Sequence, residues 1–356
     1  MSSSLCPPFS FASIIPPIIM QNVARNGTST ERDMAIHTLG IGESFRAYRA
    51  AQLPTLPPGV RRMPLMAQAT MMRSIYDADY KTELPGRLVR TEGAPPTGDP
   101  MADEAYDGLG AVWTFYNDVY DRNSIDDRGM PMLGVVHFGK QFDNAFWDTR
   151  QMVFGDGGLF KRFTAAVDVI GHELTHGVTH YETGLNYFQQ SGALNESISD
   201  VFGIMVKQRV RNLKAEESDW IIGAELFRGT NLQGVGLRSM KAPGTAYDDP
   251  VLGKDPQPGH MQGYVKTFND NGGVHINSGI PNNAFYRVAV ALGGYAWEKA
   301  GRIWYETLRD PKIRRNSGFT AFARQTIYNA GVLFGVGSKE QKAVSEAWRQ
   351  VGVQPK

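Results

Sequence analysis

The sequence predicts an α+β fold in which a strand-rich first half precedes a mainly helical second half. Short runs of β-branched and aromatic residues with turn residues between them occur in the first half, at 74–90, 131–139 and 151–160. From about residue 163 the apolar residues recur at helical spacing, over 163–181, 193–212, 281–300, 318–331 and 338–350. Because 42% of the 356 residues are hydrophobic, the chain can bury one large core or two lobes.

Charge and cysteine usage narrow the range of partners. The net charge is +1 at pH 7, so the chain has no net positive field that would attract nucleic acid or an anionic membrane surface. We expect a peptide, protein or small-molecule substrate, with no nucleic-acid and no membrane partner, and we expect a monomer. The single cysteine, Cys6, cannot form an internal disulfide.

The N-terminal stretch 9–20 is apolar, but it lacks the pattern of a signal peptide or a membrane-spanning helix. No Lys or Arg occurs before Arg25, and the pair Pro16 and Pro17 would break an apolar helix. We therefore expect no Sec signal and no membrane segment here.

A helix and a linker are predicted next. Residues 26–39 have apolar positions spaced for a helix, with Ser29 or Thr30 as a candidate N-cap and Asp33 or Glu31 in the first turn. Residues 53–64 are Pro-rich and dibasic, which indicates an exposed linker. Residues 1–70 thus form a separate unit, which we call the leader segment.

The stretch "VIGHELTHGVTHYETG" (169–184) holds three histidines at intervals of four. On a helix His172 and His176 project from one face, close enough for both imidazoles to bind one Zn²⁺. Glu173 completes the H-E-x-x-H pattern, in which the glutamate is the general base for a metal-bound water. His180 lies two turns beyond His172, about 12 Å along the axis, too far for the same ion. We interpret His180 as a polar helix-face or packing residue.

A catalytic zinc needs a third protein ligand and one open position. Glu196, at the start of the next predicted helix, can supply that ligand, and Asp200, one turn later on the same face, can accept a hydrogen bond from a ligand histidine. The alternative is a solvated acidic face. It is disfavoured because the surrounding segment is largely apolar, where an unpaired carboxylate would be costly.

Several motifs in a fixed order resemble one family. They are "GHELTHGVTHYETGLNYFQQSGALNESISDVFG" (171–203), "DNGGVHINSGI" (270–280), "NAFW" (144–147) and "LRSM" (237–240). Together they resemble the thermolysin family of zinc metallopeptidases (M4-type) over residues 71–356. The stretch "IIPPIIMQNVARNG" resembles the short propeptide of the protealysin-like subgroup. The resemblance implies a two-lobed fold: residues 1–70 as propeptide and linker, 71–180 as a strand-rich lobe ending in the zinc-binding helix, and 181–356 as a helical lobe. Zinc would lie in the cleft between the lobes.

The resemblance also implies a role for each motif residue. One Zn²⁺ would be held by His172, His176 and Glu196, with Glu173 moving the proton of the attacking water. Tyr187 and His275 would stabilise the oxyanion, and Asp270 would orient His275. Asp200 and Asn195 would hold the zinc-binding imidazoles in place. Asn144 and the backbone of Ala145 would bind the substrate as an added strand, and Arg238 would donate a hydrogen bond to a substrate carbonyl. Phe160, Phe163, Val169, Ile222 and Leu237 would line the pocket for the residue after the scissile bond; core packing is the alternative for these five.

One departure from the family concerns calcium. The family binds a pair of calcium ions beside the zinc helix through clustered carboxylates. Asp168 and Asp219 match that pattern, but Lys207, Ile221 and Ala224 stand where carboxylates are expected. We expect no double calcium site, with Lys207 pairing with Asp168 in place of an ion; calcium elsewhere is left open.

The implied activity is that of a zinc endopeptidase made as a zymogen, with its own propeptide as intramolecular inhibitor, cutting on the amino side of bulky apolar residues. A catalytically silent zinc protein would predict loss of Glu173, Tyr187 or His275, and all three are present. A zinc aminopeptidase or other zinc hydrolase would need an acidic pocket for a free amino terminus, which no motif indicates. Within the propeptide, the thiolate of Cys6 could occupy the open position of the zinc, although a lone cysteine near a terminus is more often inert. We expect secretion without a Sec signal peptide; the alternative is a cytoplasmic enzyme.

Overall fold

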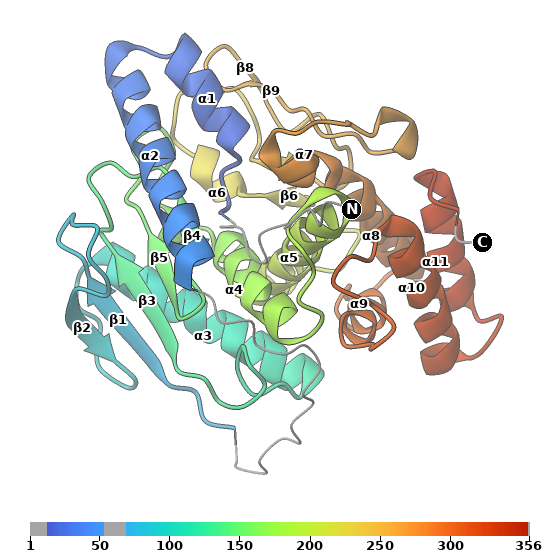
Figure 1. The fold of residues 1–356 in the computed structure, drawn as a ribbon. Coiled ribbons are helices and arrows are strands. Elements are labelled where there is room, and N and C mark those ends of the chain that lie inside the picture. The colour runs from blue at the N-terminus through green and yellow to red at the C-terminus, as the bar shows by residue number, and fades with distance from the viewer. Residues whose placement is uncertain (1–12, 53–68, 355–356) are drawn as a thin grey trace.

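The computed structural model describes residues 13–52 and 69–354, with only the backbone described for 45–52 (Figure 1). The predicted linker at 53–64 and Cys6 lie outside these residues. The described part comprises two leader helices, a lobe built on a five-stranded sheet, and a mainly helical lobe. The α+β prediction is therefore confirmed.

The five-stranded sheet has the order β2-β1-β3-β5-β4. β1 (Arg73–Asp77), β3 (Met132–Val136) and β5 (Gln151–Phe154) run parallel, while β2 (Arg87–Thr91) and β4 (Ala145–Trp147) pair antiparallel at the two edges. All three residues of β4 are buried. An edge strand carries unpaired backbone groups, so β4 can accept another extended segment.

The first lobe is less purely stranded than predicted, because it contains the 21-residue helix α3 (Pro100–Tyr120). Asp99 caps its first turn, with its carboxylate accepting from the backbone N–H of Met101, and Pro100 occupies the first position, where a missing N–H is harmless. Twelve of its residues are buried, so apolar positions lie on most sides of the helix. The sequence therefore lacks the one-sided apolar spacing by which a helix is recognised.

The second lobe is mainly helical, as predicted. Helix α4 (Val167–Tyr181) leads into this lobe. The long helices after it are α5 (Gln189–Val210), α8 (Gly279–Leu292), α10 (Phe319–Phe334) and α11 (Lys339–Gln350). The shorter elements are η1 (Phe163–Ala165), β6 (Ile221–Ile222), α6 (Ala224–Phe227), β7 (Arg238–Ser239), β8 (Asp248–Asp249), β9 (Gly253–Lys254), η2 (Met261–Gly263), α7 (Asp270–Asn277) and α9 (Ala300–Leu308). The helix predicted over 281–300 ends at Leu292, because Gly293 and Gly294 both have left-handed φ angles, of 70° and 71°.

Helices α4 and α5 cross closely at two glycines. A Cβ on Gly171 would lie 3.0 Å from the Cα of Gly203, and a Cβ on Gly203 would lie 2.5 Å from the carbonyl oxygen of Asp168. No other residue type fits such an approach without shifting the backbone. The crossing places the histidine face of α4 against the first half of α5.

The leader helices α1 (Pro17–Asn26) and α2 (Ser29–Gln52) lie across the sheet lobe and the loops of the second lobe (Figure 1). Pro17 does not break a helix but begins one. The capping residue of α2 is Thr28 rather than the predicted Ser29 or Thr30: Thr28 Oγ1 accepts from the N–H of Glu31, whose carboxylate accepts from the N–H of Thr28.

Helix α1 is anchored to the second lobe and helix α2 to the first lobe. Ile19, Met20 and Val23 of α1 are buried, and Asn22 Nδ2 donates to the carbonyl oxygen of Leu252 at 2.8 Å. From α2, Thr38 Oγ1 accepts from the backbone N–H of Asp143 at 3.1 Å. The two leader helices are thus packed as part of the folded chain.

Candidate active site

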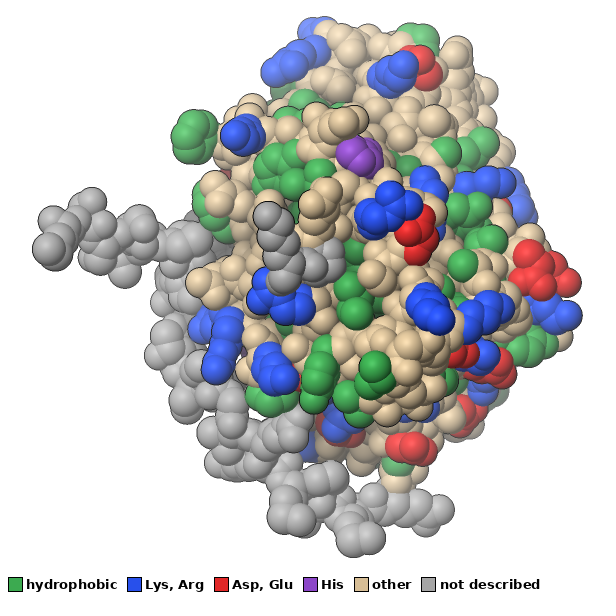
Figure 2. All heavy atoms as spheres, turned by 90° about the vertical axis from the view of Figure 1, so that its right-hand side faces the viewer, with side chains coloured by type: hydrophobic (Ala, Val, Ile, Leu, Met, Phe, Trp, Pro, Cys, Tyr) green, Lys and Arg blue, Asp and Glu red, His purple; other side chains and the backbone are tan. Residues whose placement is uncertain are grey.

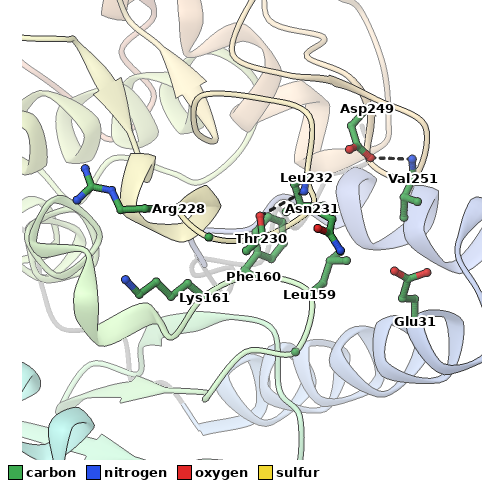
Figure 3. Close-up of a pocket in the computed structure, with 12 residues that line it drawn as sticks. Glu31, Leu159, Phe160, Lys161, Arg228, Thr230, Asn231, Leu232, Asp249 and Val251 are labelled. Atoms are coloured by element: carbon green, nitrogen blue, oxygen red, sulfur yellow. Dashed lines mark hydrogen bonds between the residues drawn. The ribbon is translucent and has the colours of Figure 1, made fainter.

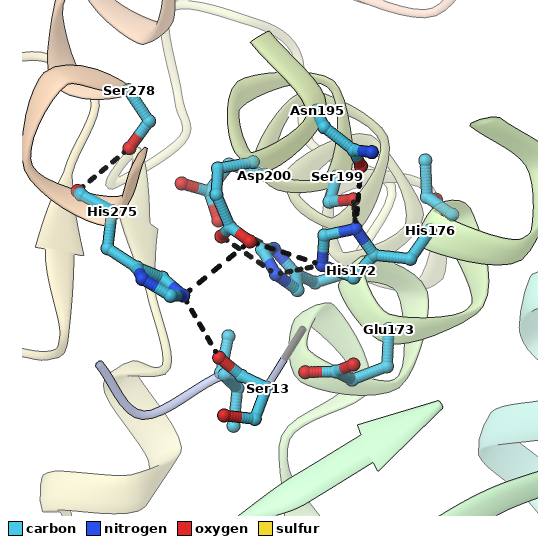
Figure 4. A network of polar contacts seen from close by, with 12 residues as sticks. Ser13, His172, Glu173, His176, Asn195, Ser199, Asp200, His275 and Ser278 are labelled. Atoms are coloured by element: carbon cyan, nitrogen blue, oxygen red, sulfur yellow. Dashed lines mark hydrogen bonds and ion pairs between the residues drawn. The ribbon is translucent and has the colours of Figure 1, made fainter. Parts of the chain in front are cut away.

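The two histidines of the H-E-x-x-H pattern lie side by side (Figure 4), and the carboxylate of Glu196 meets them in the interior. The Nε2 atoms of His172 and His176 lie 3.1 Å apart. One oxygen of Glu196 lies 3.4 Å from His172 Nε2, and the other lies 3.5 Å from His176 Nε2. The two helices therefore bring three ligand groups of the zinc-binding kind to one point.

The other nitrogen of each imidazole is held by a polar side chain of α5. His172 Nδ1 donates to Asp200 Oδ1 at 2.8 Å, and His176 Nδ1 donates to Asn195 Oδ1 at 2.8 Å. Ser199 Oγ lies 3.1 Å from the same nitrogen of His176. These partners fix the rings so that both Nε2 lone pairs face each other, an arrangement that repels unless a cation lies between them.

The charge balance of the cluster fits a metal ion. Among the described residues, Glu173 Oε1 is buried without a hydrogen-bond donor, and Glu196 Oε2 lies 3.4 Å from His172 Nε2. Burial lowers the pKa of His172, but hydrogen bonds to Asp200 and Glu196 outweigh it and raise that pKa to about 9, so this position favours positive charge. Burial lowers the pKa of His176 to about 4, which suits a neutral ligand.

Two carboxylates are within reach of one ion. His172, Glu173 and His176 can bring one ligand atom each within 4.8 Å of the others. Glu173, however, accepts a hydrogen bond at 3.1 Å from the backbone N–H of Trp147 in β4, whereas each oxygen of Glu196 faces an imidazole Nε2. Glu196 is therefore the better third ligand, which leaves Glu173 beside the site. Burial raises the pKa of Glu173 to about 8, and a cation held by the histidines would lower that pKa again.

A second polar network approaches from α7. The hydroxyl of Tyr187 donates to Glu196 and lies 3.1 Å from His275 Nε2. His275 Nδ1 donates to Asp270 Oδ1 at 2.5 Å. Burial lowers the pKa of His275, but Asp270 and Glu196 raise it to about 8 overall. The turn between Asp270 and His275 requires Gly272 and Gly273, whose φ angles are 82° and 78°.

Arg238 in β7 joins this site to Asp200. Its Nε and Nη2 atoms donate to Asp200 Oδ2 and Oδ1, each at 2.8 Å. Asn282 Nδ2 also donates to Asp200 Oδ2 at 2.8 Å. Burial raises the pKa of Asp200, but Arg238 and His172 outweigh it and lower that pKa to about 2, so the carboxylate stays charged.

Residues Ser13–Ile15 of the leader segment lie against these groups. Ile14 N–H donates to the carbonyl oxygen of Ala145 at 3.3 Å, which adds an extended segment to the exposed edge of β4. The Ile14 carbonyl accepts from Arg238 Nη1 at 3.1 Å, and the Ile15 N–H donates to Asn144 Oδ1 at 3.1 Å. His275 Nε2 lies 3.2 Å from the carbonyl oxygen of Ser13 (Figure 4).

Comparison with known proteins agrees with this geometry. Residues 65–180 match the thermolysin metallopeptidase catalytic domain, and residues 183–353 match the thermolysin metallopeptidase α-helical domain. The chain belongs to the thermolysin family of metallopeptidases. It is a zinc metalloendopeptidase of the protealysin type.

Individual relatives cover nearly the whole chain. An extracellular metalloprotease of Pectobacterium carotovorum subsp. carotovorum is 51% identical over 344 residues, 96% of each chain. Protease PrtS of Photorhabdus sp. is 48% identical over 97% of this chain and 93% of its own length. The solved structure of the precursor of protealysin, a metalloproteinase from Serratia proteamaculans, has a TM-score of 0.86 and 50% identity, covering 96% of this chain and 99% of its own.

The five residues predicted to form the specificity pocket of this thermolysin-family chain are all buried. Phe160, Phe163, Val169, Ile222 and Leu237 belong to the main apolar core, which extends through both lobes and also contains Ile14. A separate pocket of about 520 Å³ lies between Glu31 of the leader and the loops at 158–161 and 228–232 (Figure 3). Its lining includes Phe160 but none of the metal-site residues.

The position of the family's double calcium site holds a buried lysine. Lys207 Nζ lies 2.9 Å from Asp219 Oδ1 and 3.5 Å from Asp168 Oδ2, and it donates to the Ile221 carbonyl at 2.6 Å. The pairing of Lys207 with Asp168 that the sequence predicted is present. Its ammonium group stands among oxygens of the kind that would ligate calcium.

Sequence reasoning missed several contacts of this thermolysin-family site. They are the Trp147 N–H on Glu173, the Ser199 hydroxyl beside His176, and the Asn282 amide on Asp200. The first is a backbone group and leaves no residue signature. Asn282 lies far along the chain, and only the packing of α8 against α5 brings it close. His180, set aside as a ligand, packs edge-on against Tyr181 at 5.3 Å.

Proposed function

We propose that the protein is a zinc endopeptidase made as a zymogen, whose leader segment fills the substrate cleft and which cuts on the amino side of bulky apolar residues. One observation supports this above all: His275, Ala145, Arg238 and Asn144 contact consecutive backbone groups of the extended stretch Ser13–Ile15. Contacts to successive main-chain groups of an added strand are how a peptidase holds a substrate of varied sequence.

The metal would be held by His172, His176 and Glu196. When bound, Zn²⁺ supplies Lewis-acid chemistry, lowering the pKa of a water and polarising a carbonyl. Asp200 and Asn195 keep each imidazole oriented through its Nδ1 atom. These contacts leave each Nε2 as the ligand atom.

Glu173 would act as general base. Its carboxylate is buried beside the histidines, and its Oε1 has no donor within the described residues, so it can take a proton from the attacking water. The same group would then deliver that proton to the leaving amine. The N–H of Trp147 holds the other oxygen and so orients the carboxylate.

Tyr187 and His275 would stabilise the charge that develops on the carbonyl oxygen. The Tyr187 hydroxyl and His275 Nε2 lie 3.1 Å apart, so one oxygen can approach both donors. Asp270 holds His275 by its ring nitrogen and by its backbone N–H. That double contact keeps Nε2 directed at the substrate carbonyl.

The buried apolar residues Phe160, Phe163, Val169, Ile222 and Leu237 would set specificity. Each buried methylene contributes about 0.8 kcal/mol, which is about fourfold in kcat/KM, so cleavage before Leu, Ile or Phe should dominate. A cleavage map with charged residues at that position would contradict the assignment.

The zymogen would become active when the linker is cut. The Pro-rich linker at 53–64 is of the composition that proteases nick, and release of residues 1 to about 50–70 would empty the cleft. We propose that the enzyme makes this cut itself, giving a mature chain that starts between about 51 and 72. In that case wild-type protein shortens with time while Glu173→Gln stays full length by intact mass.

The central test separates metal binding from proton transfer. Glu173→Gln should keep bound zinc and the fold, yet lose turnover by about 10²–10⁴-fold, because the amide cannot accept the water proton. His172→Ala should lose the zinc as well. Zinc content, thermal midpoint and cleavage of an internally quenched peptide are measured together. Near-wild-type turnover in Glu173→Gln would remove the assigned base.

A zinc aminopeptidase is the second candidate. Twelve residues precede Ser13 in the chain, so the cleft contacts an internal stretch rather than a free amino terminus. This favours an endopeptidase. Products of a long peptide decide between the two, because an aminopeptidase releases free amino acids and an endopeptidase releases internal fragments.

Secretion fits the relatives, among which are extracellular metalloproteases. Within the described residues no helix is long and apolar enough to cross a membrane. Figure 2 shows acidic and basic side chains distributed over one face of the molecule. We propose an exported enzyme; export without a Sec signal peptide stays a prediction from the sequence.

A further inference from the structure

We propose that the Ser13–Ile14 peptide bond of the leader segment is itself a cleavage site, cut by the active site that it occupies. This inference rests on the proposed peptidase function. It concerns a bond different from those of the linker, which lies outside the described residues.

The backbone register singles out this bond. The carbonyl of Ser13 faces His275 Nε2 at 3.2 Å, the group that would stabilise an oxyanion. The next residue, Ile14, is held on both sides, through its N–H by Ala145 and through its carbonyl by Arg238. Among the described leader residues, the Ser13 carbonyl is the one within hydrogen-bond distance of His275, so the reacting carbonyl would be that of Ser13.

The side chain after the bond matches the proposed specificity. Ile14 is bulky, apolar and 0% exposed, and it belongs to the buried apolar core. Asn144 holds Ile15 through both amide atoms, with Oδ1 3.1 Å from Ile15 N and Nδ2 3.4 Å from Ile15 O. The leader is thus bound in the direction and register of a substrate that would be cut before Ile14.

A proton acceptor lies on the same side of the cleft. In Figure 4 the carboxylate of Glu173 points toward Ser13. Its Oε1 is buried and lacks a donor among the described residues, so it is available to a water that approaches the Ser13 carbonyl.

The reaction balances as a simple hydrolysis. One water adds to the carbonyl carbon of Ser13, and Glu173 takes the proton that this water releases. The bond between Ser13 C and Ile14 N then breaks, and Glu173 returns the proton to the Ile14 nitrogen. The products are a carboxylate at Ser13 and an amine at Ile14, with no oxidant or reductant involved.

The shortened leader should stay in place after this cut. Its remaining anchors lie beyond the cleaved bond, in the buried side chains of α1 and in the hydrogen bonds of Asn22 and Thr38. Loss of residues 1–13 therefore does not require linker cleavage.

The first experiment follows intact mass of the full chain after zinc is added. Wild type should yield a species that starts at Ile14, and Glu173→Gln should not. Because the bond lies in its own active site, the first-order rate constant should stay within twofold over a hundredfold dilution. A first-order rate constant that falls in proportion to concentration would mean cutting between molecules and would overturn the register.

A matched pair of leader variants tests the role of Ile14. Ile14→Asp places a charge in the apolar core and should reduce the Ser13–Ile14 cut at least tenfold. Ile18→Asp makes the same change at a half-buried leader position outside the register and should leave that cut in place. Equal loss in both variants, or in neither, would contradict the proposal.

Hydrogen exchange gives a readout that does not depend on activity. In zinc-loaded Glu173→Gln, the amides of Ile14 and Ile15 should be protected at least tenfold relative to an unfolded peptide, because both donate to the catalytic lobe. Exchange at the unfolded rate would overturn the proposal. A wild-type enzyme that cleaves a quenched peptide yet never forms the Ile14 terminus would overturn this inference alone; one that cleaves neither would overturn the proposed function.

Discussion

Arg238 and Asp200 form a bidentate ion pair in the interior, with two nitrogen–oxygen distances of 2.8 Å. The third guanidinium nitrogen of Arg238 donates to the carbonyl of Ile14, and the same Asp200 carboxylate accepts from His172 Nδ1. One side chain therefore contacts both the bound backbone and the partner of a metal-site histidine. This pair therefore links the Ile14 backbone to His172 through one continuous network of hydrogen bonds.

Arg238→Lys should separate charge from geometry. Lysine keeps the positive charge beside Asp200 but cannot reproduce the fork, so peptide binding should weaken while the protein still folds. We expect KM for a peptide substrate to rise about tenfold, which is the loss of one charged hydrogen bond. Arg238→Met, which leaves Asp200 buried without a cation, should instead destabilise the fold by about 3–5 kcal/mol. Equal thermal midpoints for the two variants would contradict this account.

The crossing of α4 and α5 gives a second prediction. Gly203→Ala would place a Cβ 2.5 Å from the Asp168 carbonyl and 3.1 Å from the His172 nitrogen, so the helices must separate. The expected loss is about 1–3 kcal/mol, together with weaker zinc retention against a chelator. Gly40→Ala is the control, because a Cβ there meets nothing within 4 Å. Unchanged zinc retention in Gly203→Ala would show that the crossing does not position the ligands.

Local patterns predicted the helix that carries His172 and His176, because the spacing and the helix lie within one stretch of chain. Helix α3 was missed since its apolar residues surround it, although Asp99 followed by Pro100 is a readable start signal. Helix α1 was missed because Pro17 was interpreted as a breaker, when the first helical position tolerates proline.

For long-range contacts, the sequence predicted which segments meet but not which residues contact each other. Occupation of the cleft by the leader was inferred from the order of the segments. Its register was not, because the contact between Ser13 and His275 joins residues 262 positions apart. The hydrogen bond from Asn282 to Asp200 likewise depends on how the helices pack. Such pairings follow from the fold and carry no signal in either local sequence.

The buried Lys207 predicts how the protein responds to calcium. The thermal midpoint of wild type should not change when calcium or a calcium-specific chelator is added, because the ammonium group already balances Asp168 and Asp219. Lys207→Glu puts a third carboxylate among these oxygens, so it should unfold more easily and regain part of the loss in millimolar calcium. Lys207→Met removes the ammonium group without adding a carboxylate, so it is the matched control and should regain less stability in calcium than Lys207→Glu. A rise in the wild-type midpoint with calcium would contradict the prediction.

His137 predicts a loss of stability at alkaline pH. Its Nδ1 lies 2.9 Å from Asp156 and its Nε2 lies 2.8 Å from Asp99, and these contacts, Asp156 first, raise its pKa from 6.5 to about 9. Because the folded pKa exceeds the unfolded one, the contribution is complete below pH 6.5 and disappears as pH rises through about 9. Discounted for its partial exposure to solvent, it amounts to about 1–2 kcal/mol. Urea denaturation of Glu173→Gln and Glu173→Gln/His137→Gln at pH 6, 7.5 and 9 measures it, since the metal-site titrations are common to both proteins. The free energy difference between them should be largest at pH 6 and shrink toward pH 9; a difference that is constant with pH would show that His137 is not held protonated in the fold.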